Sequence, residues 1–496
     1  MNFRTKSYLR KRFGDYYQNS ELPMPYDFKR REWGFIFFDE LPEVVMRRHR
    51  AFSSEGEAAE YLRGMVPAHV YHSAAYYQFP GAGTMKEKKW EGADLIFDLD
   101  ADHLPQKATS YAEMLANVKS ETGKLLDFLL EDFGFGEETI RVAFSGGRGY
   151  HIHVHDPRVL TLESAQRREI VDYIGGMGIN VDFMFREYII GGESKTYGVR
   201  REGGFGFEQN RFDASLQFKT YVLKGSKGTS QKRTITVGLG TKRIISFIDT
   251  PGGFGWGKRV SKHLVSYLGD LLSKEEHMAL GEISYAIYAY NNPSPNINNS
   301  AKEIAGRIFQ FKNEHPSWSS KRIYQEIAEN TISESFVHDI LHSGNKAKKI
   351  INIAKSEEAI KLIKDKGIID FGGVPEFFEI ILQHTVEEFG IKLGAKTDEP
   401  VTADIRRLIR MPSSLHGGSG MRVVPLTLAE FDQFEPLRDA VVFSEKEIKI
   451  EVFPPLKPQN SLVEMKGKSI KVEEGINTVP EYAGIYLMCR GAAEYA

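Results

Sequence analysis

The most constraining feature of the sequence is a short apolar segment that ends in two acids separated by a single residue. Residues 94–100, DLIFDLD, are rich in apolar, β-prone side chains and follow a glycine, so they predict a strand. Side chains two positions apart in a strand point to the same face. Asp98 and Asp100 therefore project together. Leu95, Phe97 and Leu99 face the other way. The fold must supply a cation or solvent for this pair.

A divalent metal is one way to satisfy the acidic pair. Two adjacent carboxylates repel each other unless a cation lies between them, and oxygen ligands suit Mg²⁺ or Mn²⁺. The alternative is that the D-x-D pattern only ends a strand and caps the segment that follows. Asp102 has the same parity, but we expect it in the loop after the strand.

A glycine-rich turn follows between two predicted strands, residues 141–144 and 150–155. The turn reads Ser145-Gly146-Gly147-Arg148-Gly149. Glycines permit positive φ, so the backbone N–H groups of such a turn can converge on an anion. The guanidinium of Arg148 can fork onto phosphate oxygens. An ordinary hairpin with an exposed polar face is the alternative.

The strand after this turn, YHIHVH, carries His151, His153 and His155 on one face. Its other face is apolar, which predicts packing against helices and leaves the histidine face available to a ligand. Zinc binding by the three histidines is a further possibility. The outer pair, however, is spread over roughly 13 Å of strand, too far for one tetrahedral ion.

A third constellation lies near the C-terminus. Asp398 precedes Pro400 in an extended segment, and Thr402 is placed to cap a short helix over residues 403–410. That helix would carry Arg406, Arg407 and Arg410 on one side. His416 and a Gly-Gly-Ser-Gly turn follow. Alone, the pattern equally fits a solvated arginine face beside a loop histidine.

Composition excludes several classes of protein. The 496 residues are 41% hydrophobic and contain no run of roughly 18 apolar side chains, so we expect no membrane span and a cytoplasmic location. A single cysteine, Cys489, excludes an intrachain disulfide and any zinc site built on two thiolates. The net charge is −2, so only a local basic surface could bind nucleic acid.

Taken in this order, the three segments resemble the catalytic, small subunit of archaeo-eukaryotic DNA primases, most closely its archaeal branch. The resemblance rests on FDLDADH at 97–103, SGGRGYHIHV at 145–154 and DEPVTADIRRLIRMPSSLHG at 398–417. It implies an α/β (α+β) fold with an RRM-like antiparallel sheet and an inserted helical subdomain. We expect a catalytic core in residues 1–260 and 371–445, a helical insertion in 261–370 and an extension in 446–496.

The resemblance also implies roles for individual residues. Asp98, Asp100 and Asp398 match the three catalytic carboxylates that hold two Mg²⁺ or Mn²⁺ ions, with Asp404 as a rival for the third. Ser145, Arg148, His151, Arg410 and His416 match residues that bind the triphosphate of the incoming nucleotide. Glu32 and Arg48 fall near an upstream position that also touches the site. Family members usually carry a Cys/His zinc knuckle after the D-x-D strand, but residues 101–140 contain no cysteine, so no structural zinc is expected.

The activity implied is nucleotidyl transfer: synthesis of short primers for replication, from NTPs or dNTPs, on a single-stranded DNA template. Catalytic primase subunits pair with a large, regulatory subunit, which we expect as a partner. A related gap-filling polymerase, an inactive nucleic-acid-binding module and, more weakly, a phosphotransferase or nuclease are the alternatives. Residues 195–243 carry eleven Lys and Arg against three Asp and Glu. They either track the template backbone or form an ordinary solvated hairpin.

Overall fold

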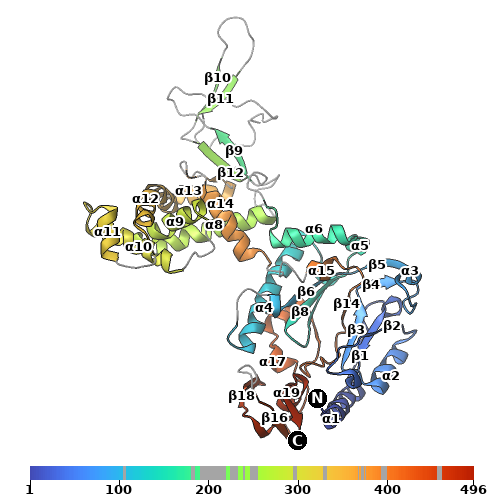
Figure 1. The fold of residues 1–496 in the computed structure, drawn as a ribbon. Helices are drawn as coiled ribbons and strands as arrows, with labels where there is room; N and C mark the ends of the chain where they lie inside the picture. Colours follow the sequence, from blue (N-terminus) through green and yellow to red (C-terminus); the bar gives the residue numbers. More distant parts are fainter. Residues whose placement is uncertain are drawn as a thin grey trace. The chain divides into compact units, whose positions relative to one another are not determined.

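The protein is described by a computed structural model whose contacts group the chain into two units (Figure 1). One unit comprises residues 1–177 and 391–496, and the other comprises residues 178–390. The structure describes residues 1–103, 108–179, 185–189, 219–223, 233–237, 241–245, 255–293, 299–327, 332–366, 368–369, 374, 376–391, 399–454 and 461–496. No helix in these ranges is long and apolar enough to cross a bilayer.

The first unit contains a four-stranded antiparallel sheet in the order β15-β7-β8-β6. Its strands are β6 (Leu95–Asp100), β7 (Ile140–Phe144), β8 (Gly149–Val154) and β15 (Val424–Leu426). The acidic strand and the histidine strand predicted from the sequence are therefore neighbours. In the register of this pair, Asp98 lies opposite His151 and Asp100 lies opposite Gly149.

A second four-stranded antiparallel sheet has the order β14-β3-β1-β2. It consists of β1 (Trp33–Ile36), β2 (Arg47–Arg50), β3 (His69–Ser73) and β14 (Leu408–Arg410). The helix predicted over 403–410 is wrong. Helix α15 (Glu399–Ala403) ends earlier, and the Asp404 carboxylate, outside any helix, accepts the backbone N–H of Arg406 at 2.9 Å. The chain then pairs with β3, because this pairing buries Leu408 and Ile409, and tertiary burial outweighs the helical spacing of the arginines.

Apolar and polar contacts join the two sheets. Ile96 of β6, Ile409 of β14 and Ala74 form one buried cluster. Beside it, the buried carboxylate of Asp94 accepts hydrogen bonds from the Arg31 guanidinium at 2.6 Å. Arg31 also donates to the backbone carbonyls of residues 26, 73 and 74. Burial is tolerated because each polar group of the pair has a partner.

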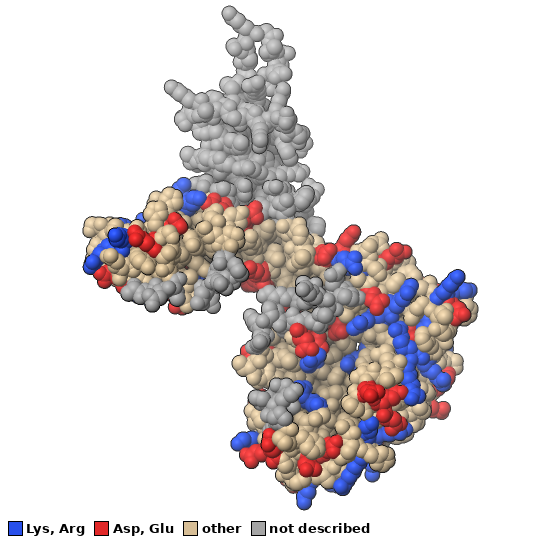
Figure 2. All heavy atoms as spheres, viewed as in Figure 1, with Lys and Arg blue, Asp and Glu red and all other residues tan. Residues whose placement is uncertain are grey.

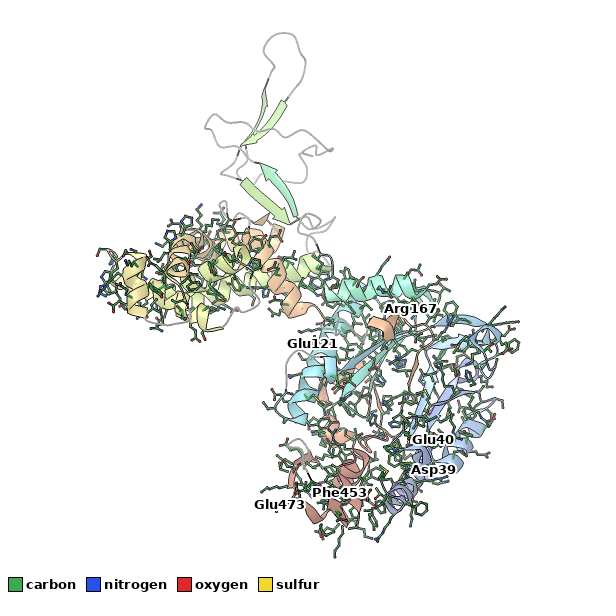
Figure 3. All side chains as sticks on the ribbon, in the orientation of Figure 1. Asp39, Glu40, Glu121, Arg167, Phe453 and Glu473 are labelled. Atoms are coloured by element: carbon green, nitrogen blue, oxygen red, sulfur yellow. The ribbon has the colours of Figure 1, made fainter. Side chains whose placement is uncertain are left out.

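A second buried arginine, Arg167, fixes the start of β6 (Figure 3). Its guanidinium donates to the carbonyl oxygens of Ala93, Asp94, Val159 and Leu162 at 2.7–3.1 Å. It lies on helix α6 (Ser164–Gly175), so this helix is tied to the acidic strand by side-chain-to-backbone hydrogen bonds.

Helices cover the apolar face of the first sheet, as the sequence predicted. Helix α4 (Tyr111–Asp127) contacts β6 and β8 and begins at Ser110, whose side chain accepts the N–H of Glu113. A π-helical turn, Phe128–Asp132, continues it. On β8, the buried ring of Tyr150 packs edge-on against Phe431 of helix α16 (Leu428–Gln433), with ring centroids 5.5 Å apart.

The rest of this unit surrounds the sheets and brings the chain ends together. Tyr8 near the N-terminus stacks on Tyr495, with ring centroids 4.0 Å apart. The remaining elements are α1 (Phe3–Asn19), η1 (Phe28–Arg30), η2 (Phe38–Glu40), α2 (Glu55–Met65), β4 (Ala75–Tyr77), α3 (Met85–Lys88), β5 (Trp90–Ala93), η3 (Ala101–His103), η5 (Glu137–Thr139), α5 (Pro157–Leu160), α17 (Pro436–Asp439), β16 (Glu447–Val452), β17 (Leu462–Met465), β18 (Lys468–Lys471), β19 (Gly475–Pro480), α19 (Glu481–Cys489) and β20 (Ala493–Tyr495).

The second unit is a helical bundle with short strands. Seven helices of its described residues share one hydrophobic core: α8 (Gly255–Ser273), α9 (Glu276–Asn291), α10 (Asn299–Glu314), α11 (Ser320–Ile327), α12 (Glu334–Ala354), α13 (Glu357–Lys366) and α14 (Glu376–Phe389). The strands are β9 (Phe185–Ile189), β10 (Lys219–Leu223), β11 (Arg233–Val237), β12 (Thr241–Ile245) and β13 (Ile368–Ile369).

The mixed helical and antiparallel-sheet fold that the resemblance implies is confirmed. The unit boundaries near 178 and 390 differ from the predicted insertion, 261–370, which lies inside the second unit. Within the basic stretch 195–243, β10 and β11 pair as an antiparallel hairpin. Most of that stretch, and so its predicted contact with a template, lies outside the described residues.

We expect the Asp94–Arg31 pair to support the whole first unit. Asp94→Asn should lower the free energy of unfolding by about 3 kcal/mol, because it leaves a buried guanidinium without its counter-charge. Asp15→Asn is the control, since that carboxylate pairs with Arg12 but is 47% exposed, and its loss should cost about 1 kcal/mol or less. Urea unfolding followed by circular dichroism measures both. If both variants lost the same free energy of unfolding, the Asp94–Arg31 pair would not have the supporting role assigned to it.

Candidate active site

The two acids of β6 lie at the end of the strand, where their side chains reach solvent. Asp98 and Asp100 are 23% and 30% exposed, whereas the other residues of β6 are buried. Oδ1 of Asp98 lies 3.4 Å from Nε2 of His151, and Oδ2 of Asp100 lies 3.4 Å from the Arg148 guanidinium. Both contacts are longer than an ordinary charge-assisted hydrogen bond, and both carboxylates are partly exposed to solvent.

The glycine turn closes directly onto the acidic strand. A Cβ atom at Gly149 would lie 1.8 Å from the carbonyl oxygen of Leu99, so only glycine allows β6 and β8 to approach this closely. Within the turn, Oγ of Ser145 accepts the backbone N–H groups of Gly147 and Gly149 at 3.3 and 3.2 Å. Ser145 therefore shapes the turn from inside.

Two hydroxyl groups from other parts of the chain hold the carbonyls of the turn. The Tyr111 hydroxyl donates to the Gly147 carbonyl at 2.5 Å, and the Ser419 hydroxyl donates to the Gly146 carbonyl. Among the residues that the structure describes, no acceptor pairs with the N–H groups of Gly146 and Arg148. The turn thus keeps two backbone donors for an anion.

Tyr111 is itself held by the C-terminal helix. Its ring lies 5.8 Å from that of Tyr486 on α19, and the Arg490 guanidinium lies over both rings at 5.7 and 5.2 Å. The predicted extension, 446–496, therefore contributes to the support of the glycine turn.

The third motif brings Arg410 and His416 to the same place. Arg410 leaves β14 and donates to Nδ1 of His69 on β3 at 2.6 Å. His416 accepts the Gly418 N–H at its Nδ1, so its Nε2 carries the proton. A Cβ atom at Gly147 would lie 3.0 Å from this Nε2, which places the imidazole against the turn.

The buried histidines around the site are neutral at pH 7. Burial lowers the pKa of His151 to about 3, and the positive charges of Arg410 and Arg407 add to this effect. Burial and the charge of Arg410 also hold the pKa of His69 and His416 well below the usual range. Positive charge at the site therefore comes from the arginines.

The predicted open histidine face is not what the structure has. His151 is only 3% exposed, and the His153 ring stacks on His72 of β3 with centroids 5.9 Å apart, because the second sheet covers this face. His155 is taken up by Asp94, with Nδ1 2.8 Å from that carboxylate. In the described part of the chain, Nδ1 of His151 has no hydrogen-bond partner.

Glu32 and Arg48 meet in an ion-pair cluster around the buried carboxylate of Glu32. The carboxylate of Glu32 accepts two hydrogen bonds from the Arg48 guanidinium at 3.0 and 3.1 Å, and it lies 2.6 Å from Nζ of the fully buried Lys88. Burial alone would raise the pKa of Glu32, but the two cations lower it below its usual value. Nothing in the sequence pattern singled out Lys88.

The acidic pair fits a hard divalent ion by the chemistry of its donors, which are two adjacent, partly exposed carboxylates. Asp398, the predicted third ligand, lies outside the described residues. Within the described ranges, no group of three or more metal-ligating side chains converges. The third ligand therefore stays a prediction.

Sequence reasoning missed the residues that support the site from outside its motifs. His69, Tyr111 and Ser419 contact the motif residues only through the fold. The sequence around these residues gives no pattern that assigns them this role. Only their tertiary contacts show that they support the site.

Comparison with known proteins shows the family of the chain. A family model described as DNA primase small subunit matches residues 97–428. Over its whole length the chain is 43% identical to the DNA primase small subunit PriS of Methanosarcina acetivorans, with 98% of that protein covered. It is 41% and 35% identical to the PriS proteins of Methanococcoides burtonii and Halobacterium salinarum, each covered over 100% of its length.

The neutral histidines predict acid sensitivity of the fold. Because the unfolded chain binds protons at these groups below about pH 6.5 and the folded chain does not, stability should fall as the pH drops from 7 toward 4. For His151 alone the loss at pH 5 is about 2 kcal/mol. His72→Gln removes another buried histidine, whose pKa burial holds well below normal, and should flatten the dependence.

Thermal unfolding between pH 4 and 8 measures this effect. His338→Gln is the matched control, since this side chain is 69% exposed, and the substitution should leave the profile unchanged. A melting temperature that is constant from pH 7 to 5 would rule out the neutral-histidine account.

Proposed function

The chain belongs to the family of DNA primase small subunits, and from that premise we propose that the end of β6 and the glycine turn form its nucleotidyl-transfer site. The observation that supports this most directly is the β6–β8 register, which sets Asp98 beside His151 and Asp100 beside the turn. A DNA primase of this kind is a polymerase-type enzyme that acts on a DNA template with nucleoside triphosphates.

In the reaction, a 3′-hydroxyl oxygen attacks the α-phosphorus of the incoming nucleotide, a new P–O bond forms, and pyrophosphate leaves. Asp98 and Asp100, with Asp398, would hold two divalent ions, Mg²⁺ or Mn²⁺. When bound, such ions make the hydroxyl a better nucleophile and offset charge on the leaving oxygens. The same pair of acids therefore defines where the reacting oxygens meet.

The glycine turn, together with Arg148 and Arg410, would bind the triphosphate. The N–H groups of Gly146 and Arg148 offer fixed donors, and the Arg148 guanidinium, 44% exposed, can leave its contacts with Asp100 and Asp102 to meet phosphate oxygens. Neutral His151 and His416 would act as hydrogen-bonding groups, with the charge supplied by Arg148 and Arg410. Positioning and electrostatics supply most of the rate in such transfers.

The replicative role and its partner complete the proposal. We expect the chain to work on single-stranded DNA in a heterodimer with a large, regulatory subunit. A gap-filling polymerase is the competing function, and it would need a primer with a free 3′-hydroxyl. Synthesis from nucleotides alone on an unprimed single strand, with ribonucleotide and deoxyribonucleotide pools tested separately, distinguishes the two.

We predict that Asp100→Asn abolishes nucleotide addition and leaves the fold intact, because the amide oxygen is uncharged and holds a hard divalent cation far more weakly than the carboxylate does. Asp102→Asn is the matched control. Its carboxylate contacts Arg148 at 2.5 Å from the 3₁₀ turn after the strand, so the rate at saturating nucleotide should stay near that of the unaltered protein. Primer extension and circular dichroism test both variants. Near-normal extension by Asp100→Asn would disprove the assignment.

We predict that Tyr111→Phe raises the KM for nucleotide about two- to tenfold, because one hydrogen bond that holds the Gly147 carbonyl is lost. The rate at saturating nucleotide and the affinity for single-stranded DNA should both stay unchanged. Steady-state kinetics with varied nucleotide, beside a DNA titration, separates these quantities. A parallel loss in both would indicate general damage and count against a positioning role.

A further inference from the structure

The edge of the second sheet is a strand made only of basic residues. All four residues of β2, Arg47–Arg50, are exposed, and β2 has β1 as its only neighbour in this sheet. Its outer backbone groups and its side chains therefore meet solvent along the same line. Figure 2 shows Lys and Arg atoms gathered on the side of this unit where Figure 1 draws β2, β4 and α3.

A β-bulge in the pairing of β1 with β2 gives these four side chains different surroundings. Trp33 pairs with Arg50 and Phe35 pairs with Arg47. Two residues of β2, Arg48 and His49, therefore lie opposite the single residue Gly34 of β1. His49 has φ of 66°, and its N–H donates to the Glu32 carboxylate at 3.1 Å. Arg48 is drawn to the same buried acid, which neutralises it and leaves the other two arginines on the surface.

The surface arginines rest on aromatic rings. Arg47 is 62% exposed and lies over Phe37 at 5.2 Å, while Arg50 lies over Tyr61 at 4.9 Å. The arrangement spreads their stems over apolar surface and presents the charged heads to solvent. Glu40 pairs with Arg47 at one end of the strand, where Figure 3 labels Asp39 and Glu40.

An exposed aromatic residue lies beside the other end of β2. The β4–β5 hairpin approaches the strand at Gly81, where a Cβ atom would lie 3.5 Å from that of Ala51 and 3.8 Å from the His49 carbonyl oxygen. Phe79 in this hairpin is 49% exposed, and Nζ of Lys89 lies 5.1 Å from its ring centroid. An open ring thus adjoins a row of cations.

Two further arginines, the exposed Arg406 and the half-buried Arg407, lie just before β14. Burial raises the pKa of Tyr77 on β4 to about 12, and the charges of Arg48 and Arg406 both oppose the rise. Arg406 therefore lies near the same phenol as Arg48. The next residue, Arg407, is close enough to His151 to lower the pKa of that imidazole.

We propose that β2 and the tip of the β4–β5 hairpin, through Arg47, Arg50, Lys89 and Phe79, bind the single-stranded template on its way to the site. Cations spaced along a strand meet backbone phosphates, and an open ring stacks on a base without regard to its identity. An acidic protein surface would use the cations but not the exposed ring. The inference rests on the proposed function, because only a template-directed enzyme needs such a path.

The test compares the unaltered chain with Arg47→Gln/Arg50→Gln and with Phe79→Ala. Binding of a labelled, mixed-sequence single-stranded DNA is measured by fluorescence anisotropy over a series of salt concentrations. Lys468→Gln/Lys471→Gln is the matched control, with the same loss of two charges at lysines 54% and 76% exposed on the hairpin β17–β18. Circular dichroism checks that every variant is folded.

We expect the double arginine variant to bind about tenfold more weakly at low salt, with the slope of log K against log salt reduced by about 1.4, which is two phosphate contacts. Phe79→Ala should weaken binding about fivefold or more with the slope unchanged, because stacking releases no counterions. The lysine control should match the unaltered chain. In synthesis assays, the KM for template should rise in the first two variants and the KM for nucleotide should not.

Unchanged affinity and slope in the double arginine variant would overturn the inference. So would a variant whose DNA binding is intact but whose association with the large subunit is weakened, since the strand would then bind protein. Either result, in a chain that still makes primers, leaves the proposed function standing. Failure of the unaltered chain to bind single-stranded DNA or to make primers would instead refute the proposed function.

Discussion

The pairing of β6 with β8 is the constraint on which the rest of the site depends. It is possible only because Gly149 lacks a Cβ, which would otherwise collide with the Leu99 carbonyl oxygen. That close approach sets Asp98 against His151 and ends the acidic strand at the glycine turn. A shift of one residue would move both carboxylates to the apolar face, where Phe97 and Leu99 now pack. Register and chemistry are therefore inseparable in this protein.

The interior between the two sheets contains polar side chains, and its buried histidines are neutral at pH 7. Asp94 and Arg31 compensate each other, and neighbouring imidazoles stay neutral because burial and nearby guanidiniums disfavour their protonation. The consequence for function is a division of labour. Arginines at the proposed site would provide charge, whereas His151 and His416 would provide hydrogen-bonding atoms whose protonation does not change near pH 7.

The parts of the chain that shape the site come from both of its ends. Helix α1 holds the loop before His416, since the Tyr16 hydroxyl donates to the Ser413 carbonyl at 2.8 Å. Helix α19 supports Tyr111 and, through it, the glycine turn. The carbonyls of Gly146 and Gly147 are thus held by hydroxyl groups from distant parts of the chain, and the N–H groups of Gly146 and Arg148 would be available to a triphosphate. The basic edge at β2 would then lead the template toward these residues.

The sequence pattern predicted three strands correctly, because side chains alternate between the two faces of a strand. The strands around 94–100, 141–144 and 150–155 and the turn between the last two follow from side-chain alternation and from glycine. The helix over 403–410 was wrong, because arginine spacing mimics a helical face while burial of Ile409 beside Ile96 requires a strand. From sequence alone came the candidate residues for the chemistry. Only the tertiary structure decided which of them are neutral and what holds them, because burial, Coulomb interactions and long-range hydrogen bonds exist only once distant segments meet.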